Sequence, residues 1–168
     1  MPHLTLISGF PGCGKTTFAS WLASTHGYLH VDMERGGLDR DGLRELWNHY
    51  VDGSDRDSFV ATMLERSSSI VLDWNFPPRC LDLIQALRGQ GFEVWWFEGY
   101  RLAARQRFLE RGTEPVEAFD AHVGEICVAW RSIEPIVGPN VVNTIKSDGS
   151  FLSHETIWRR FRRSVKQN

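Results

Sequence analysis

The sequence predicts a single α/β domain with a mostly parallel, five-stranded sheet and helices on both of its faces. Short aliphatic and aromatic runs alternate along the chain with stretches in which apolar residues recur at helical spacing. This alternation is typical of parallel strands that are joined by right-handed helical crossovers. A length of 168 residues, with 42% hydrophobic and 24% charged residues, suits one such domain with one core.

Five runs rich in aliphatic, β-branched or aromatic residues predict the strands. They are residues 4–8, 28–31, 70–72 and 92–97, and a last strand that begins at Val141. The run at 92–97 is almost unbroken, as expected for a strand that is covered on both faces. A ligand crevice is then expected at the carboxyl ends of the strands.

Apolar residues at positions i, i+3, i+4 and i+7 predict the helices. Their inward-facing markers are Phe18, Trp21 and Leu22; Leu43, Leu46, Trp47 and Tyr50; Phe59, Met63 and Leu64; Leu81, Ile84 and Leu87; Val116, Phe119, Val123, Ile126, Cys127 and Trp130; and Ile157, Phe161 and Val165. A basic helix is expected at residues 101–111, before Gly112. Ser54 and Asp55 can cap the helix that follows them, and Pro77-Pro78 can open the next one.

Charge and hydropathy narrow the functional classes. Nineteen basic residues face 21 acidic ones, so the formal net charge is −2 and no global positive field indicates an obligate nucleic-acid or membrane partner. The apolar runs are far shorter than the ~18–20 residues that span a bilayer, and the first residues do not resemble a secretory signal. Cys13, Cys80 and Cys127 are odd in number and widely spaced, which argues against a disulfide framework or a clustered zinc site. A cytoplasmic location is therefore expected.

The strongest functional signal is the segment Gly9-Phe10-Pro11-Gly12-Cys13-Gly14-Lys15-Thr16, which fits G-x-x-x-x-G-K-[ST] between a predicted strand and a predicted helix. Its glycines allow backbone N–H groups to surround a phosphate at a helix N-terminus. Lys15 is expected to reach the β- and γ-phosphates, and the Thr16 hydroxyl to ligate Mg²⁺. The predicted cofactors are ATP and Mg²⁺. The predicted nucleotide-binding residues are Gly9, Pro11, Gly12, Cys13, Gly14, Lys15, Thr16 and Thr17.

Acidic residues follow two of the predicted strands. Asp73 ends the strand at 70–72, where a magnesium partner for the phosphate loop belongs, although an acid that caps the next helix would look the same. Asp32 ends the second strand and should open on the same crevice. A carboxylate there can orient and deprotonate an attacking hydroxyl, with Arg35 holding the acceptor. Glu34 competes with Asp32 for the role of the base.

The basic helix carries Arg101, Arg105, Arg107 and Arg111 as two i, i+4 pairs. Arg107 and Arg111 share a face just before Gly112, where they can close over ATP and neutralise charge on the transferring phosphoryl group. A solvated basic helix is the alternative. The arginines of the last helix are interpreted as a solvated face, with a nucleic-acid contact as the minority interpretation.

These residues together resemble the P-loop kinases of the polynucleotide-kinase and zeta-toxin branch, and the resemblance covers most of the chain. Besides the glycine-rich loop, it depends on Asp32-Met33-Glu34-Arg35, which is similar to that family's D-x-x-R. It also depends on the D-x-N at 73–75 with its following Pro-Arg, and on residues 107–113, which resemble a lid. Trp74 replaces a smaller polar residue of the family, and residues 33–69 match no known acceptor site.

The resemblance implies a three-layer P-loop fold for residues 1–168, with sheet order 2-3-1-4-5 and a lid at about 101–130. It implies Asp32 as general base, Arg35 and Asn75 at the acceptor, Asp73 and Thr16 at the magnesium ion, and Lys15, Arg107 and Arg111 at the phosphates. The family phosphorylates nucleic-acid ends, sugars, antibiotics and nucleotide sugars, so the shared residues do not choose the acceptor.

The function predicted first is an ATP-dependent kinase that transfers the γ-phosphoryl group to a hydroxyl, on either a polynucleotide 5′ end or a small molecule. The alternative is a P-loop hydrolase or switch that acts on a partner. Ile145-Lys146-Ser147-Asp148 lacks the Asn or Thr that usually precedes Lys-x-Asp in guanine readers. A nucleic-acid-binding module would need exposed aromatic residues, whereas tryptophans at helical spacing belong more often to a core.

Overall fold

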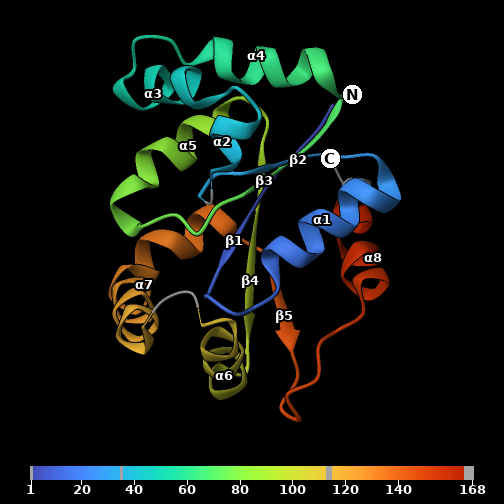
Figure 1. The fold of residues 1–168 in the computed structure, drawn as a ribbon, viewed down its shortest axis with the longest axis vertical. Helices are drawn as coiled ribbons and strands as arrows, with labels where there is room; N and C mark the ends of the chain where they lie inside the picture. Colours follow the sequence, from blue (N-terminus) through green and yellow to red (C-terminus); the bar gives the residue numbers. More distant parts are fainter. Residues whose placement is uncertain (1, 35, 113–114, 165–168) are drawn as a thin grey trace.

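Five parallel strands form one sheet in the order β2-β3-β1-β4-β5 (Figure 1). The computed structural model describes residues 2–34, 36–112 and 115–164. The strands are β1 (His3–Gly9), β2 (Leu29–Asp32), β3 (Ser69–Asp73), β4 (Glu93–Gly99) and β5 (Val141–Ile145). Both the five predicted strands and the sheet order implied by the family resemblance are confirmed.

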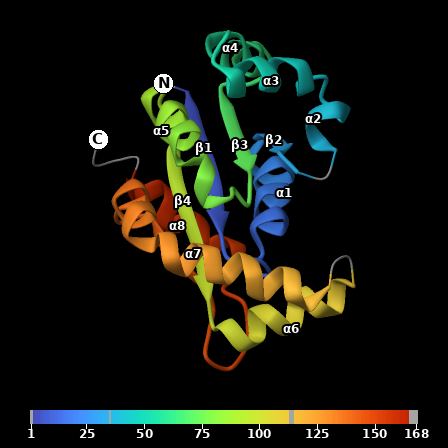
Figure 2. The same ribbon diagram turned by 90° about the vertical axis from the view of Figure 1, so that its left-hand side faces the viewer.

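Helices cover both faces of the sheet, as the sequence predicts. They are α1 (Lys15–His26), α2 (Gly37–Arg40), α3 (Arg44–Asp52), α4 (Asp57–Arg66), the 3-10 turn η1 (Pro78–Cys80), α5 (Leu81–Gly89), α6 (Arg101–Arg111), α7 (Val116–Val137) and α8 (His154–Ser164). Figure 1 shows α1 and α8 on one side of the sheet, and α5 and α7 on the other. Turned by 90°, the molecule shows α6 and α7 side by side at the end of the sheet where β4 finishes (Figure 2).

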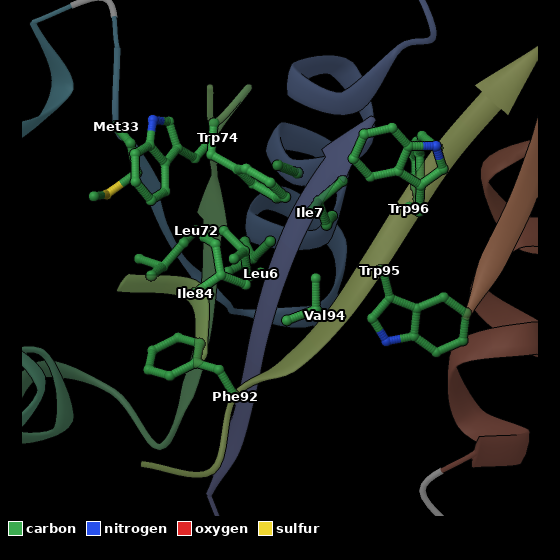
Figure 3. Close-up of a cluster of buried hydrophobic side chains, with 14 of the residues drawn as sticks. Leu6, Ile7, Met33, Leu72, Trp74, Ile84, Phe92, Val94, Trp95 and Trp96 are labelled. Atoms are coloured by element: carbon green, nitrogen blue, oxygen red, sulfur yellow. The ribbon is translucent and has the colours of Figure 1, made fainter. Parts of the chain in front are cut away.

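The core is continuous through the sheet and carries many aromatic rings. Leu6 and Leu72 pair in register on β1 and β3 and are fully buried, and both appear in the cluster of Figure 3. On the face covered by α8, the ring of Phe161 stacks on Trp95 with centroids 3.9 Å apart, and it also meets Phe18 of α1 at 5.2 Å. This packing fixes α1, and with it the loop that precedes α1, against the centre of the sheet.

Several details differ from the sequence-based expectation. Cys127, expected to face inward, is exposed, because the buried stripe of α7 runs through Phe119, Ile126 and Ile133. The short helix α2 was not predicted, and α7 runs past Trp130 to Val137 with Pro135 inside it. The Pro77-Pro78 pair opens a 3-10 turn before α5 begins. Leu64, expected to face inward, is exposed because it lies beside the buried Met63 stripe of a short helix. Val165 lies outside the described residues.

Within the described part of the chain, no helix is both long enough and apolar enough to cross a membrane.

Candidate active site

The glycine-rich loop between β1 and α1 leaves no room for side chains at two positions. Gly9 has φ +134°, and a Cβ there would lie 1.9 Å from the Phe97 carbonyl oxygen of β4. Gly12 has φ +78°, and a Cβ there would lie 2.2 Å from the Ala104 carbonyl oxygen of α6. Among the described residues, no side chain caps the N-terminus of α1. The first N–H groups of α1 can therefore accept an anion as their partner, which is how helix N-termini bind phosphate.

Lys15 is buried at the start of α1 and folds back over its own loop. Its Nζ donates hydrogen bonds to the carbonyl oxygens of Phe10, at 2.9 Å, and Gly9, at 3.2 Å. Burial lowers the pKa of Lys15, while the nearby charge of Asp73 acts in the opposite direction. A cation held with so little water around it interacts strongly with a bound phosphate.

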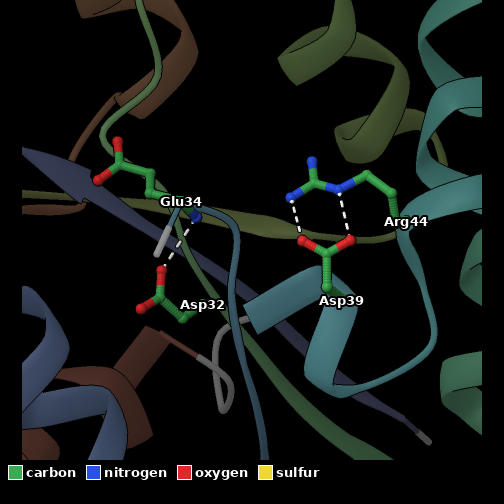
Figure 4. Close-up of polar contacts among 4 residues, drawn as sticks. All are labelled: Asp32, Glu34, Asp39 and Arg44. Atoms are coloured by element: carbon green, nitrogen blue, oxygen red, sulfur yellow. Dashed lines mark hydrogen bonds and ion pairs between the residues drawn. The ribbon is translucent and has the colours of Figure 1, made fainter. Parts of the chain in front are cut away.

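Asp32 and Asp73 lie side by side at the carboxyl ends of neighbouring strands, as the sequence predicts. They are paired in register between β2 and β3, and both are buried, at 9% and 5% exposure. The Asp32 carboxylate accepts a hydrogen bond from the Glu34 backbone N–H at 2.9 Å (Figure 4). Gly37 packs against the Asp32 backbone so closely that a Cβ there would lie 2.0 Å from its carbonyl oxygen. The turn after β2 thus fixes the position of Asp32.

Glu34 directs its side chain away from Asp32 in Figure 4. Glu34 is exposed as a residue, but partial loss of water around its carboxyl group raises its pKa, and the neighbouring charges of Asp73 and Asp32 raise it further. Lys15 and a hydrogen bond with the Asn75 backbone act in the opposite direction. Three carboxylates therefore gather on one side of the site.

A cavity of about 550 Å³ joins the phosphate loop to these acids. Its lining residues come from the loop, from the ends of β2 and β3, and from the two helices α6 and α7. They are Pro11, Gly12, Gly14, Lys15, Thr16, Thr17, Asp32, Glu34, Asp73, Asn75, Pro77, Phe108, Arg111, Ala118 and His122. Most of the residues predicted from the sequence are thus brought to one cavity.

Two of the predicted nucleotide-binding residues, Gly9 and Cys13, do not line the cavity but accept hydrogen bonds that hold the loop in place. The Gly9 carbonyl accepts a hydrogen bond from Lys15, and the Cys13 side chain is buried, which raises the pKa of its thiol to about 11. The Cys13 carbonyl accepts a 2.9 Å hydrogen bond from the hydroxyl of Thr144 on β5, which also donates to the Glu98 carbonyl at 3.1 Å. Thr144 is a support of the loop that the sequence analysis missed, because no local pattern marks it.

The arginines of α6 have different surroundings. Arg111 lines the cavity. Arg107 is not among the lining residues; its guanidinium pairs with Glu110 at 3.3 Å and lies over the Phe151 ring at 5.8 Å. Arg105 forms a bidentate pair with Asp120 of α7. Arg35, predicted at the acceptor, lies outside the described residues.

His122 of α7 also lines the cavity, together with Ala118 one turn earlier. The sequence analysis missed it. Its spacing in the sequence could have indicated it. Ala118 and His122 are four residues apart and so lie on one face of α7, next to the buried residues Phe119 and Ile126.

The donor set fits a magnesium ion. Thr16 supplies a hydroxyl oxygen and Asp73 a carboxylate at the cavity wall. No cluster of three or more His, Cys, Asp or Glu side chains able to hold a metal ion occurs in the described ranges. Mg²⁺ needs no such cage, because in nucleotide sites it keeps several waters and binds phosphate oxygens with one or two protein ligands.

Comparison with known proteins agrees with this geometry. No family model matches the chain. The chain is 30% identical over 169 residues to the adenylate kinase isoenzyme 6 homolog of Schizosaccharomyces pombe, covering 94% of this chain and 91% of that protein.

Solved structures show the same fold at low sequence identity. Shikimate kinase from Acinetobacter baumannii, in complex with shikimate, has a TM-score of 0.61 with 14% identity, over 100% of this chain and 95% of that one. Shikimate kinase from Bacteroides thetaiotaomicron has a TM-score of 0.57 with 14% identity, over 99% of both chains. A gluconokinase from Sinorhizobium meliloti has a TM-score of 0.53 with 17% identity, over 94% and 88%. Together with the phosphate loop and the sheet order, the similarity to the S. pombe protein shows that this chain belongs to the P-loop kinases, in the family of that adenylate kinase isoenzyme 6 homolog.

Proposed function

We propose that the protein is an ATP- and Mg²⁺-dependent kinase that transfers the γ-phosphoryl group to the hydroxyl of a small molecule. The observation that carries this proposal is that the buried carboxylate of Asp32 lines the same cavity as Lys15 and Thr16 of the phosphate loop. An acid opposite a phosphate loop is the arrangement that phosphoryl transfer to an alcohol requires.

The phosphate loop and α6 would hold the nucleotide. The N–H groups at the start of α1 and the Lys15 ammonium bind the phosphates, and Arg111 approaches from the opposite wall of the cavity. Thr16 and Asp73 hold the magnesium ion, which neutralises charge on the β- and γ-phosphates when it is bound. Residues 101–130, which are α6 and the first part of α7, act as a lid over this nucleotide.

Asp32 would act on the acceptor. Its carboxylate is fixed by the Glu34 N–H and accepts the proton of the attacking hydroxyl, so that the oxygen is a better nucleophile as its bond to phosphorus forms. Glu34 remains the alternative base, since its pKa is raised and it lines the same cavity.

A nucleoside monophosphate is the second candidate acceptor, and the similarity to an adenylate kinase isoenzyme 6 homolog favours it. Such an acceptor brings a further phosphate. Near Asp32 the described lining residues are acidic, with three carboxylates against the two cations Lys15 and Arg111, which the nucleotide already requires. This charge distribution favours an acceptor without a phosphate group.

A polynucleotide 5′-hydroxyl is the finer expectation from the polynucleotide-kinase resemblance. The exposed arginines of α8, Arg159, Arg160 and Arg162, belong to a helix that packs beside α1 on the opposite face of the sheet from α7 (Figure 1). They do not line the cavity. The proposal therefore takes a small alcohol as acceptor and keeps the oligonucleotide as an arm of the test.

The test is transfer of labelled phosphate from ATP to a panel of sugars, aminoglycoside-like alcohols, nucleosides, AMP and oligonucleotide 5′-hydroxyls. Label is expected on one class of small alcohol. Asp32→Asn should lower this transfer by about 10²–10⁴-fold while the affinity for ATP is retained. Asp39→Asn is the matched control, because Asp39 pairs with Arg44 at the surface (Figure 4).

Each other outcome contradicts a defined part of the proposal. Label on AMP alone would replace the alcohol with a phosphate acceptor, and label on oligonucleotides alone would restore the polynucleotide-kinase branch. Hydrolysis that no acceptor in the panel stimulates would favour the hydrolase or switch. Full activity of Asp32→Asn together with loss in Glu34→Gln would make Glu34 the base.

A further inference from the structure

His30 of β2 lies next to the carboxylate assigned to the magnesium ion. Its Nε2 is 3.9 Å from Oδ2 of Asp73, and its Nδ1 is 3.5 Å from the hydroxyl of Ser20 on α1. The imidazole side chain is 16% exposed and the Asp73 side chain 6%. The three side chains form a row from the surface of α1 to the wall of the cavity.

The two ring nitrogens of His30 have different surroundings. The Ser20 hydroxyl can donate to Nδ1 or accept from it, and in the tautomer in which it donates, the ring proton lies on Nε2. Nε2 is buried and makes no hydrogen bond to any other described residue, and a buried N–H that lacks a partner is unfavourable. The group that it faces is the Asp73 carboxylate. At 3.9 Å the contact is longer than a direct hydrogen bond, so it leaves this carboxylate able to turn.

The position of Asp73 shows why such a neighbour matters. A carboxylate that ligates Mg²⁺ must present one oxygen to the ion in near-octahedral geometry. The second oxygen needs a donor that holds the group in this orientation, and ligands of metal ions in proteins are commonly fixed in this way by a hydrogen bond from an outer residue. The side chain of His30 on β2 reaches Asp73 and can supply an N–H donor, which the neighbouring carboxylate of Asp32 cannot do when it is ionised.

We propose that His30 is a positioning residue for the magnesium site. Its Nε2–H closes on one oxygen of Asp73 when the other oxygen turns to the metal ion, and the Ser20 hydroxyl fixes the orientation and tautomer of the ring. The inference rests on the proposed function only in that Asp73 serves Mg²⁺; it is independent of the acceptor.

The experiment measures metal binding without turnover. Mn²⁺, which replaces Mg²⁺ and is detected by electron paramagnetic resonance, is titrated into the protein saturated with a non-hydrolysable ATP analogue. His30→Leu keeps the volume of the ring and removes its nitrogens, whereas His30→Gln keeps an N–H donor. We expect His30→Leu to weaken Mn²⁺ binding by about 10-fold or more, and His30→Gln to restore most of the affinity.

Two controls separate positioning from packing. The affinity for the nucleotide in EDTA should be unchanged in both variants, because the phosphate loop does not depend on His30. His49→Gln should bind Mn²⁺ like the unmodified protein, since His49 is exposed and contacts Ser54 away from the cavity.

The proposal is overturned if Leu and Gln at position 30 have equal effects, or if Asp73→Asn weakens Mn²⁺ binding and His30→Leu does not. An unchanged Mn²⁺ affinity in Asp73→Asn would overturn both the assignment of Asp73 and this inference. Failure of every alcohol in the transfer panel would leave the Mn²⁺ result intact, so the two proposals fail separately.

Discussion

The two walls of the cavity are built in different ways. On the sheet side, Gly9 touches the backbone of β4 with no space for a Cβ, and Lys15 and Asp73 are 8% and 5% exposed. On the lid side, the polar contacts lie in solvent. Arg105 pairs with Asp120 and Arg107 with Glu110, through side chains that are 39–55% exposed.

We call the glycine-rich loop with Lys15, Asp32 and Asp73 the floor of the cavity, and the helices α6 and α7 its adjustable wall or lid. The floor is held by buried contacts, and the lid carries exposed ion pairs. Close backbone contacts have a single geometry, whereas exposed ion pairs contribute little to stability and are exchanged at low cost. Under the proposed function we therefore expect that Arg107 can leave Glu110 when a nucleotide binds, while the loop and the carboxylates at the strand ends keep their places. Substitutions on the two walls should differ accordingly.

The largest effect is expected from Lys15→Met on the floor. The loss of the buried ammonium should lower kcat by about 10³-fold, because no other described residue reaches the same place in the loop. Stability should not fall with activity. Burial lowers the pKa of Lys15, so its charged form opposes folding, and methionine removes this cost.

The measurements are phosphate transfer and urea unfolding of both proteins. A group whose pKa is lowered by folding binds fewer protons in the folded state than in the unfolded chain. The free energy of unfolding of the unmodified protein should therefore rise relative to that of Lys15→Met as pH rises toward the ordinary lysine pKa of 10.5. A variant that loses activity only because it unfolds at a lower urea concentration would contradict this reading of the floor.

Gly12→Ala should destabilise the protein more than Gly53→Ala, although the two glycines have φ values of +78° and +79°. At Gly53 nothing lies within 4 Å of the new methyl group. Alanine there should lower the free energy of unfolding by about 1–2 kcal/mol, because it must adopt the left-handed backbone conformation. At Gly12 the methyl group also meets the Ala104 carbonyl of α6, which should add about 1–3 kcal/mol. Urea unfolding measures both, and equal losses would mean that α6 moves away freely.

Arg111→Ala tests the adjustable wall. Arg111 lines the cavity, so its loss should lower kcat/KM for ATP by about 10²-fold through lost stabilisation of phosphate charge. Arg105→Ala is the matched control and should leave transfer unchanged, since Arg105 pairs with Asp120 at the surface. A loss in Arg107→Ala as large as in Arg111→Ala would show that Arg107 leaves Glu110 and Phe151 when the lid closes.

The sequence predicted the floor better than the lid, for a physical reason. The phosphate loop, Asp32 and Asp73 are set by local signals: a fixed glycine spacing, and acids that directly follow apolar strands. Because the strands are parallel, their carboxyl ends lie at the same edge of the sheet, and the residues that follow them are brought together. The positions of Lys15, Asp32 and Asp73 therefore follow from short segments of sequence.

The supports of the site escaped prediction because they depend on distant segments. Thr144 donates to the Cys13 carbonyl across 131 positions of sequence, and nothing near Thr144 marks that contact. His122 reaches the cavity only through the crossing of α7 over the sheet edge (Figure 2). Arg107 lies over the ring of Phe151, which is far along the chain. Helical spacing gives the face of a residue but not its partner.

Thr144→Val breaks one of these distant supports of the floor. The variant removes the single hydroxyl proton that the carbonyl groups of Cys13 and Glu98 share, and should cost about 1–3 kcal/mol of stability. The affinity for ATP should also fall, because the loop is no longer tied to β5. Thr144→Ser keeps the hydroxyl and should recover both quantities in urea unfolding and nucleotide titration. Equal behaviour of Val and Ser would mean that the hydroxyl does not hold the loop.

The smallest effect is expected from Glu34→Gln, because Glu34 lines the cavity but is exposed to solvent. Loss of water around the carboxyl group raises the pKa of Glu34, so the folded protein keeps this proton at pH values where the unfolded chain has lost it. The contribution of Glu34 to stability therefore falls as pH rises above its ordinary pKa of 4.5. Glutamine cannot ionise, so Glu34→Gln should be slightly more stable than the unmodified protein at pH 7 and equal to it below pH 4.5.

Asp39→Asn provides the opposite sign in the same urea titrations. The hydrogen bond from Arg44 lowers the pKa of Asp39, so this carboxylate stabilises the fold above its ordinary pKa of 3.8, and the stabilisation is lost as pH falls. Asp39→Asn should therefore be slightly less stable at pH 7. A Glu34→Gln variant that also loses stability at pH 7 would show that attraction to Lys15 outweighs the loss of water. The charged Glu34 carboxylate would then stabilise the fold, as Asp39 does through its pair with Arg44.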